Sequence, residues 1–198
     1  MQARSEETRS QIISAAYLLF AHSGYDATGV AEICQAAGVS KGAFYYHFPS
    51  KQALFLELMD NWLAELDRGF EQSIQVAPSV PEAIEHMAYT AAKILQSERA
   101  HLSIILEFWR QAYRDPTIWQ NASAHYRRYH RYLVTLILQG TTDGTLRNID
   151  PDVAGRVFVS LALGLLMQAM FDPQGADWEK ETRQSVRLLL NFFIQEAS

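Results

Sequence analysis

Apolar residues recur along this chain at the three- and four-residue spacing of α-helices, and no stretch shows the sustained alternation of a half-buried strand. Ser5 predicts the start of the first helix and Gly24 its end. The apolar stripe of that helix comprises Ile12, Ile13, Ala16, Leu19 and Phe20. The pattern therefore predicts an all-α protein.

Polar residues with free side-chain oxygens mark the starts of the next three helices. Thr28 is a candidate N-cap for a helix that stops at Gly38, and Ser40 for a short helix over residues 41–48. Ser50 is placed to cap a long helix over residues 51–75.

Five further helices are predicted, about nine in all. Ser79 and Glu82 have capping-box spacing, and Asp150 and Asp177 precede the last two helices. The predicted ranges are 81–97, 100–114, 117–139, 151–171 and 177–196. With the loop 76–80 as a candidate boundary, we expect a small N-terminal domain and a larger helical bundle. By function, we assign residues 1–50 to the first domain and residues 51–198 to the second, with residues 51–75 as the connecting helix.

The two short helices on either side of residues 38–40 have the spacing of a helix-turn-helix, whose second helix enters the major groove of DNA. The second of them ends in five consecutive aromatic residues, 44–48, which cannot all face inward on a helix. Phe44 and Phe48 share one side and are predicted to anchor the helix in the core. The other three rings, Tyr45, Tyr46 and His47, are then left to face the duplex, where they can donate to phosphate oxygens.

Residues at helix starts supply the other candidate DNA contacts. Lys41 and Gly42 lie at the end of the recognition helix that approaches base edges. As predicted caps, Ser40 and Thr28 leave N-terminal amides that favour a phosphate, and Lys51 adds a full charge beside another helix start.

The distribution of charge restricts any nucleic-acid contact to one region. A net charge of −5 argues against a protein that binds nucleic acid over its whole surface. Residues 33–56, however, contain no acidic residue, whereas Lys41, His47 and Lys51 lie among them. We therefore expect a local anion-binding surface.

The motif T-x-x-x-x-I-x-x-A-G-V-S-x-G-x-x-Y-x-H-F-x-x-K-x-x-L, residues 28–54, resembles the DNA-binding domain of the TetR family of transcriptional repressors. The resemblance implies a homodimer that binds a palindromic double-stranded DNA operator and releases it when a small-molecule effector enters the C-terminal domain. It implies no cofactor. It assigns base reading to Lys41, Gly42, Ala43 and Tyr45, and phosphate contacts to Thr28, Ser40, Tyr46, His47 and Lys51. Cys34 departs from the family pattern, and its spacing places it on the buried side of its helix.

Fifteen of the 23 aromatic residues lie after residue 60, and they are either core or the lining of an apolar effector pocket. The stretches LEFWRQAYRDP and GLLMQAMFDP resemble choline-responsive repressors within the family, which leaves the ligand unidentified. The candidate ligand-binding residues are Phe108, Trp109, Tyr113, Tyr126, Tyr129 and Met167.

Two polar features of the C-terminal region have structural interpretations. Glu107 could bind a cationic ligand, but it shares a helix side with Arg110 and Arg114, which favours a solvated face. His125 and His130 are five residues apart and do not share a helix side, so we expect no metal site.

The run 157–171 is shorter than a membrane span, which favours a buried helix. The segment 186–194 is likewise apolar on more than one side. We expect helices 151–171 and 177–196 to pair with their copies in a homodimer. A single cysteine and a polar N-terminus unlike a secretory signal predict a cytoplasmic protein.

Three alternatives stay open from sequence: a helix-turn-helix regulator with no small-molecule inducer, an activator, and an all-α enzyme. The enzyme would need a nucleophile and base, a metal set or a phosphate loop, and we find no pattern for any of them. We therefore expect a DNA-binding regulator that is not an enzyme.

Overall fold

The computed structural model describes residues 2–96 and 99–194, and within these ranges the chain forms nine α-helices and no strand. The all-α prediction is confirmed. The helices are α1 Gln2–Ser23, α2 Val30–Ala37, α3 Lys41–His47, α4 Lys51–Val76, α5 Val80–Gln96, α6 Arg99–Ala112, α7 Pro116–Thr142, α8 Pro151–Phe171 and α9 Trp178–Phe193. Residues 97 and 195–196, which were predicted to end α5 and α9, lie outside the described residues.

Most of the predicted helix starts are confirmed by hydrogen bonds. The hydroxyl oxygen of Ser40 accepts from the Ala43 amide at 3.1 Å, and that of Ser50 accepts from the Ala53 amide at 3.0 Å. Asp150 and Asp177 accept backbone amides at the starts of α8 and α9. Each of these side chains satisfies an amide that the first turn of its helix leaves free.

Two predicted starts are wrong. Helix α1 begins at Gln2, so Ser5 lies within the helix. The N-cap of α2 is Gly29 instead of Thr28, because the Thr28 hydroxyl donates backward to the carbonyl oxygen of Gly24 at 2.8 Å.

The chain divides into two compact units. The first comprises Met1–Ala64 and Arg99–Trp119, and therefore contains the N-terminal helices together with α6. The second comprises Glu65–Glu98 and Gln120–Ser198. The border between the units cuts α4 and α7, and the functional division at residue 50 stays a prediction.

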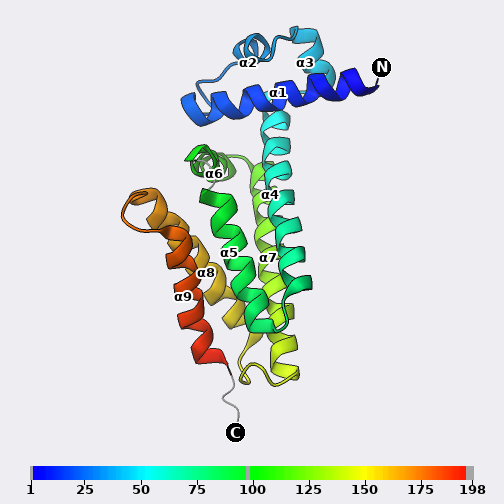
Figure 1. The fold of residues 1–198 in the computed structure, drawn as a ribbon. Coiled ribbons are helices and arrows are strands. Elements are labelled where there is room, and N and C mark those ends of the chain that lie inside the picture. The colour runs from blue at the N-terminus through cyan, green and yellow to red at the C-terminus, as the bar shows by residue number, and fades with distance from the viewer. Residues whose placement is uncertain (1, 97–98, 195–198) are drawn as a thin grey trace. The chain divides into compact units, whose positions relative to one another are not determined.

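In the first unit, α1 packs against α2, α3 and α6 (Figure 1). Its core includes Phe20 of α1 and Phe55 of α4, whose rings meet edge to face with centroids 5.6 Å apart. Cys34 is buried in α2, as its spacing predicted. This core holds the short helices α2 and α3 against the long helix α1.

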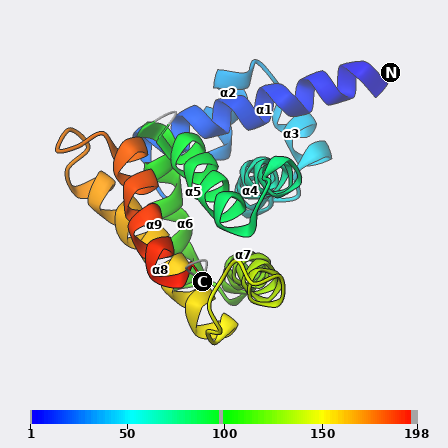
Figure 2. The ribbon, with the colours of Figure 1, turned by 60° about the horizontal axis from the view of Figure 1, so that its bottom comes forward.

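In the second unit, α9 packs against both α5 and α8, and the three helices lie side by side in Figures 1 and 2. The prediction that α8 is buried is wrong within the chain. Among the described residues, it is the one helix long and apolar enough by length and composition to cross a membrane, yet only 22% of its most apolar window is buried. Large exposed apolar residues of α8 and α9 are Val153, Val157, Leu163, Met167, Phe171, Leu188 and Phe192.

Candidate nucleic-acid interface and effector site

Helix α3 has one buried side and one exposed side, as its aromatic run predicted. Phe44 and Phe48 are 0% and 1% exposed, whereas Tyr45 and Tyr46 are 54% and 80% exposed. The guanidinium of Arg9, on α1, lies 5.4 Å from the centroid of the Phe48 ring. The two phenylalanines therefore fix α3 in the core, and two phenol rings face outward.

The turn before α3 is compact and presents the start of that helix to solvent. Gly38 adopts the left-handed conformation, with φ of 67°, that ends α2 and favours glycine. Ser40, Lys41 and Gly42 are exposed and Ala43 is half-buried. The structure thus brings these predicted contacts together at one exposed helix end.

His47 lies at the other end of α3. Its ring is half-buried and meets the Tyr46 ring edge to face, with centroids 5.0 Å apart. The predicted DNA contacts of this segment therefore extend from the N-cap Ser40 to His47, the last residue of α3.

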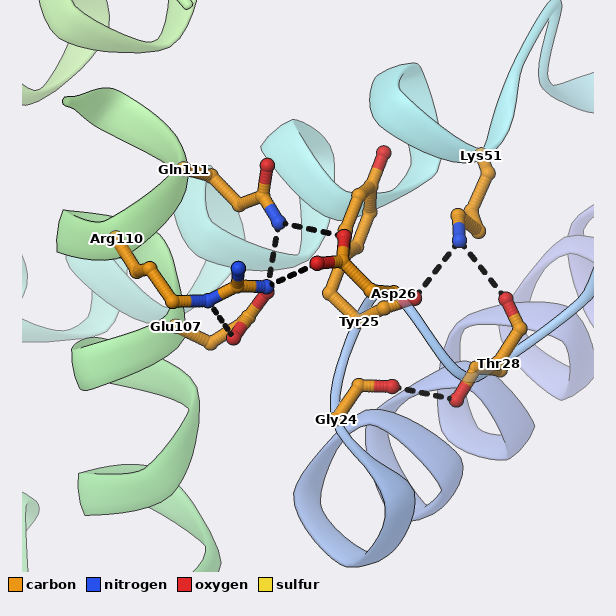
Figure 3. A network of polar contacts seen from close by, with 8 residues as sticks. All are labelled: Gly24, Tyr25, Asp26, Thr28, Lys51, Glu107, Arg110 and Gln111. Atoms are coloured by element: carbon orange, nitrogen blue, oxygen red, sulfur yellow. Dashed lines mark hydrogen bonds and ion pairs between the residues drawn. The ribbon is translucent and has the colours of Figure 1, made fainter. Parts of the chain in front are cut away.

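Thr28 and Lys51 use their polar atoms inside the protein (Figure 3). Thr28 is 1% exposed, and its hydroxyl is bonded to Gly24 as described above. Lys51 Nζ donates to the carbonyl oxygens of Tyr25 at 2.7 Å and Thr28 at 2.9 Å. Both side chains stabilise the loop between α1 and α2, and the phosphate contacts assigned to them stay predictions.

The same loop is bonded to α6 through Asp26, in a network that the sequence did not reveal (Figure 3). Arg110 Nη2 donates to Asp26 Oδ2 at 2.8 Å, and Gln111 Nε2 donates to Asp26 Oδ1 at 3.1 Å. Glu107 accepts from Arg110 Nε at 2.9 Å and Nη2 at 2.6 Å, and from Gln111 Nε2 at 2.8 Å. The spacing of Glu107, Arg110 and Gln111 is a signal for contacts within one helix, but it does not identify Asp26 as their partner.

The interpretation of Glu107 as part of a solvated face is wrong. Its side chain is only 12% exposed, whereas the apolar residues Leu106 and Trp109 are 48% and 42% exposed. Burial alone would raise the pKa of Glu107, but the hydrogen bonds from Arg110 and Gln111 outweigh it and hold the pKa below its usual value. Helix α6 therefore turns its polar side toward the loop between α1 and α2, because Asp26 lies there.

A second polar contact joins α4 to the start of α7 within the first unit. Gln52 Nε2 donates to Asp115 Oδ2 at 2.8 Å, and this bond is the main cause that lowers the pKa of Asp115. Asp115 Oδ1 accepts the backbone amides of Thr117 and Ile118 at 2.8 and 3.2 Å. Asp115 is therefore both a helix cap and a contact to α4.

The six candidate ligand-binding residues are divided between the two units. In the first unit, Phe108 is a core residue against Phe55, and Trp109 and Tyr113 are exposed. In the second unit, Tyr126 and Met167 are exposed and Tyr129 is half-buried. Their role in effector binding stays a prediction.

Polar groups are buried around Tyr129 in the second unit. Asp67 of α4 forms an ion pair with Arg128 of α7. Among the described residues, Asp67 Oδ1 and the Tyr129 hydroxyl are buried without a hydrogen-bond partner. Burial, followed by the charge of Asp67, raises the pKa of Tyr129. The Phe70 ring meets the Tyr129 ring edge to face at 5.5 Å.

Two family models match the chain. Residues 12–58 match the model for bacterial regulatory proteins of the tetR family, and residues 82–194 match the model for the C-terminal domain of BetI-type transcriptional repressors. The second match alone covers more than half of the chain. The protein therefore belongs to the TetR family of transcriptional regulators and has a BetI-type C-terminal domain. It is a DNA-binding regulator and not an enzyme.

Curated relatives and solved structures agree with this assignment. The chain is 27% identical to the HTH-type transcriptional regulator AcrR of Shigella flexneri over 201 residues, which cover 96% of this chain and 91% of that protein. It is 21% identical to the regulator UidR of Escherichia coli K12 over 182 residues, which cover 91% of this chain and 89% of that protein.

Two of the similar structures contain ligands. A putative transcriptional regulator from Saccharomonospora viridis in complex with choline has a TM-score of 0.85 and 21% identity, covering 96% of this chain and 100% of that one. FadR from Bacillus subtilis in complex with stearoyl-CoA has a TM-score of 0.81 and 21% identity, covering 91% of this chain and 96% of that one. At these identities the similarity shows a shared fold.

Proposed function

We propose that this protein is a homodimeric repressor that binds a palindromic operator and releases it on binding a small molecule. The observation that carries the DNA-binding part is the two-sided helix α3, where buried Phe44 and Phe48 leave Tyr45 and Tyr46 exposed beside Lys41. A helix-turn-helix places such a helix in the major groove.

In this proposal, the residues of α3 have two kinds of contact. Phosphate contacts position a protein on DNA, whereas contacts to base edges select the sequence. The hydroxyl oxygen of Ser40 already accepts the Ala43 amide, which leaves its proton free for a phosphate oxygen. We assign base contacts to Lys41, Gly42, Ala43 and Tyr45, and phosphate contacts to Ser40, Tyr46 and His47.

The exposed apolar faces of α8 and α9 support the homodimer. Leu188 and Phe192 are 64% and 67% exposed and one helical turn apart on α9, and Phe171 of α8 is 79% exposed. Apolar surface of this kind favours burial against another protein surface. A dimer related by a two-fold axis presents two recognition helices to half-sites about 34 Å apart, or a multiple of that distance.

The effector part of the proposal places a small molecule in the second unit. The polar atoms without partners, Asp67 Oδ1 and the Tyr129 hydroxyl, support this choice, because a buried polar group without a hydrogen bond is costly. A ligand donor would satisfy the carboxylate, and the phenol can donate or accept. The ligand would then change the separation of the recognition helices through α4, by as much as its affinity differs between the two states.

The DNA-binding part is tested by a gel shift of the protein's own upstream DNA against a random duplex of equal length, over a salt series. We expect preference for the upstream DNA together with an affinity that falls steeply with salt. Equal affinity for both duplexes at every salt concentration would refute sequence-specific recognition.

The effector part is tested with choline and stearoyl-CoA as probes, added separately to the protein–DNA complex. Release of the DNA by one probe, weakened in the variant Tyr129→Phe, is the expected result. Binding of a probe to the free protein with no change in DNA affinity would instead favour a regulator without a small-molecule inducer.

A further inference from the structure

The loop between α1 and α2, residues 24–28, is held by two other helices of the first unit (Figure 3). From α4, Lys51 binds two of its backbone carbonyl oxygens. From α6, Arg110 and Gln111 bind both carboxylate oxygens of Asp26. The backbone and the one acidic side chain of this loop are therefore fixed from separate sides.

The two side chains of α6 that bind Asp26 are also held by Glu107, on the same helix. Glu107 receives two hydrogen bonds from Arg110 and one from Gln111, which orients both donor groups. Gln111 is buried, at 9% exposure, and the Glu107 side chain is 12% exposed. Because the donors already have a fixed orientation, little side-chain entropy is lost when they bind Asp26.

Asp26 lies close in sequence to the start of α2, the first helix of the helix-turn-helix. Gly29, three residues later, is the N-cap of α2, and the Glu32 carboxylate of α2 accepts the Gly29 amide at 3.5 Å. Helix α2 is joined to α3 by the tight turn at Gly38. A shift of the loop therefore moves the start of α2 and, through the turn, the recognition helix.

We propose that Asp26 is a positioning residue for operator recognition: by binding Arg110 and Gln111, it holds α2 and α3 in one orientation on α6. This inference rests on the DNA-binding function proposed above. Specific binding requires each recognition helix of the dimer to have a single orientation at its half-site. Orientational freedom of the recognition helices therefore weakens specific binding in both subunits. Non-specific binding uses phosphates, which many orientations can reach. The network should therefore increase the ratio of specific to non-specific affinity.

The test compares Asp26→Asn, Arg110→Gln and the double variant with the wild type, on the upstream DNA and on a random duplex, by fluorescence anisotropy. Each single variant should bind the upstream DNA about fivefold more weakly and the random duplex within about twofold of the wild type. The double variant should bind within about twofold of the singles, because both changes break the same contact.

The matched control is Arg114→Gln, which removes a guanidinium from the exposed end of the same segment. Arg114 lowers the pKa of Asp26 through its charge, whereas the hydrogen bonds that hold Asp26 come from Arg110 and Gln111. The control should keep the wild-type ratio of the two affinities. An equal loss on both duplexes in Asp26→Asn, or losses that multiply in the double variant, would overturn the proposal.

Hydrogen exchange of the DNA-free protein separates this inference from the function on which it rests. In Asp26→Asn, the amides of residues 24–38 should exchange faster, while the remaining core amides of the first unit keep their protection. A wild type without preference for its upstream DNA would refute the proposed function. Unchanged exchange in residues 24–38 of Asp26→Asn would overturn the positioning role by itself.

Discussion

Lys51 Nζ lies 2.7 Å from the backbone carbonyl oxygen of Tyr25 and 4.2 Å from the centroid of the Tyr25 ring. One ammonium group therefore donates a hydrogen bond to this residue and lies within cation–π distance of its ring. It also donates to Thr28, so that the first turn of α4 binds the loop that precedes α2. Lys51, which is predicted to contact a phosphate, therefore also stabilises the loop that precedes α2.

Replacing Lys51 by Met should reduce the free energy of unfolding by about 1–3 kcal/mol, since hydrogen bonds from a charged donor are lost. Urea unfolding at neutral pH measures the change. Lys41→Met is the control, because Lys41 is exposed, and it should change stability by less than about 0.5 kcal/mol. Equal stability of Lys51→Met and the wild type would leave Lys51 with a DNA contact as its main role.

Replacing Phe44 by Ala should destabilise the protein more than Lys51→Met does, because the Phe44 ring is fully buried and packs against the Phe48 ring in the core. A loss of about 3–5 kcal/mol is expected from the missing apolar contacts and the cavity. Tyr45→Ala, on the exposed side of the same helix, should cost far less. Thermal unfolding of the two variants side by side checks this, and similar losses would contradict the two-sided arrangement of α3.

Lys41→Ala should relax the sequence preference at one operator position, because Lys41 lies at the exposed start of α3. The discrimination lost there should be about 1–3 kcal/mol. Competition between upstream DNA and its single-base variants measures it. If discrimination falls evenly at every position, Lys41 contacts the phosphates instead of a base.

The proposed dimer predicts a mass of twice 22.5 kDa in solution for the wild type. Phe192→Asp places a charge on the exposed apolar face of α9, and it should give a monomer in light scattering after size exclusion. Leu138→Asp is the matched control, because Leu138 is 51% exposed but lies on α7. A dimer that persists in Phe192→Asp would place the interface elsewhere.

The Asp26 contact should depend on pH in a defined direction. Hydrogen bonds from Arg110, followed by those from Gln111, lower the pKa of Asp26 below its usual value. Its contribution is therefore present above the unfolded pKa of about 3.9 and is lost as the pH falls through the lower folded pKa.

The measurement for this prediction is the urea midpoint of the wild type and of Asp26→Asn between pH 7 and pH 3. The wild type should have the higher midpoint at pH 7, and the difference should shrink below about pH 4. The corresponding difference for Phe44→Ala involves no titrating group and should keep its size. A constant difference for Asp26→Asn would show that its carboxylate charge contributes nothing to stability.

The order of the helices and the identity of the DNA-binding motif were predictable from the sequence because both depend on local patterns. Ser40 caps α3 with a hydrogen bond to a residue three positions away, and Phe44 and Phe48 share a side because they are four residues apart. These relationships hold in any fold that contains the helix.

Local patterns failed where a side chain had a choice of partners. Thr28 has the sequence pattern of a cap, but its hydroxyl donates to the carbonyl oxygen of Gly24. Lys51 donates to the carbonyl oxygens of Tyr25 and Thr28, which the sequence pattern does not predict, and its phosphate contact stays a prediction. For α6, the sequence pattern predicts the wrong exposed side. Helical periodicity shows that the polar and apolar sides of a helix differ, but it does not show which side packs against a partner.

The sequence by itself therefore determined the order of the helices, a helix-turn-helix, and which rings of α3 are anchors. Only the tertiary structure decided that Asp26 meets Arg110, 84 residues away, and that the apolar sides of α8 and α9 stay uncovered within one chain. The physical reason is range: capping and helical periodicity act over a few residues, whereas the partner of a charged side chain or of an apolar face is set by how the whole chain packs.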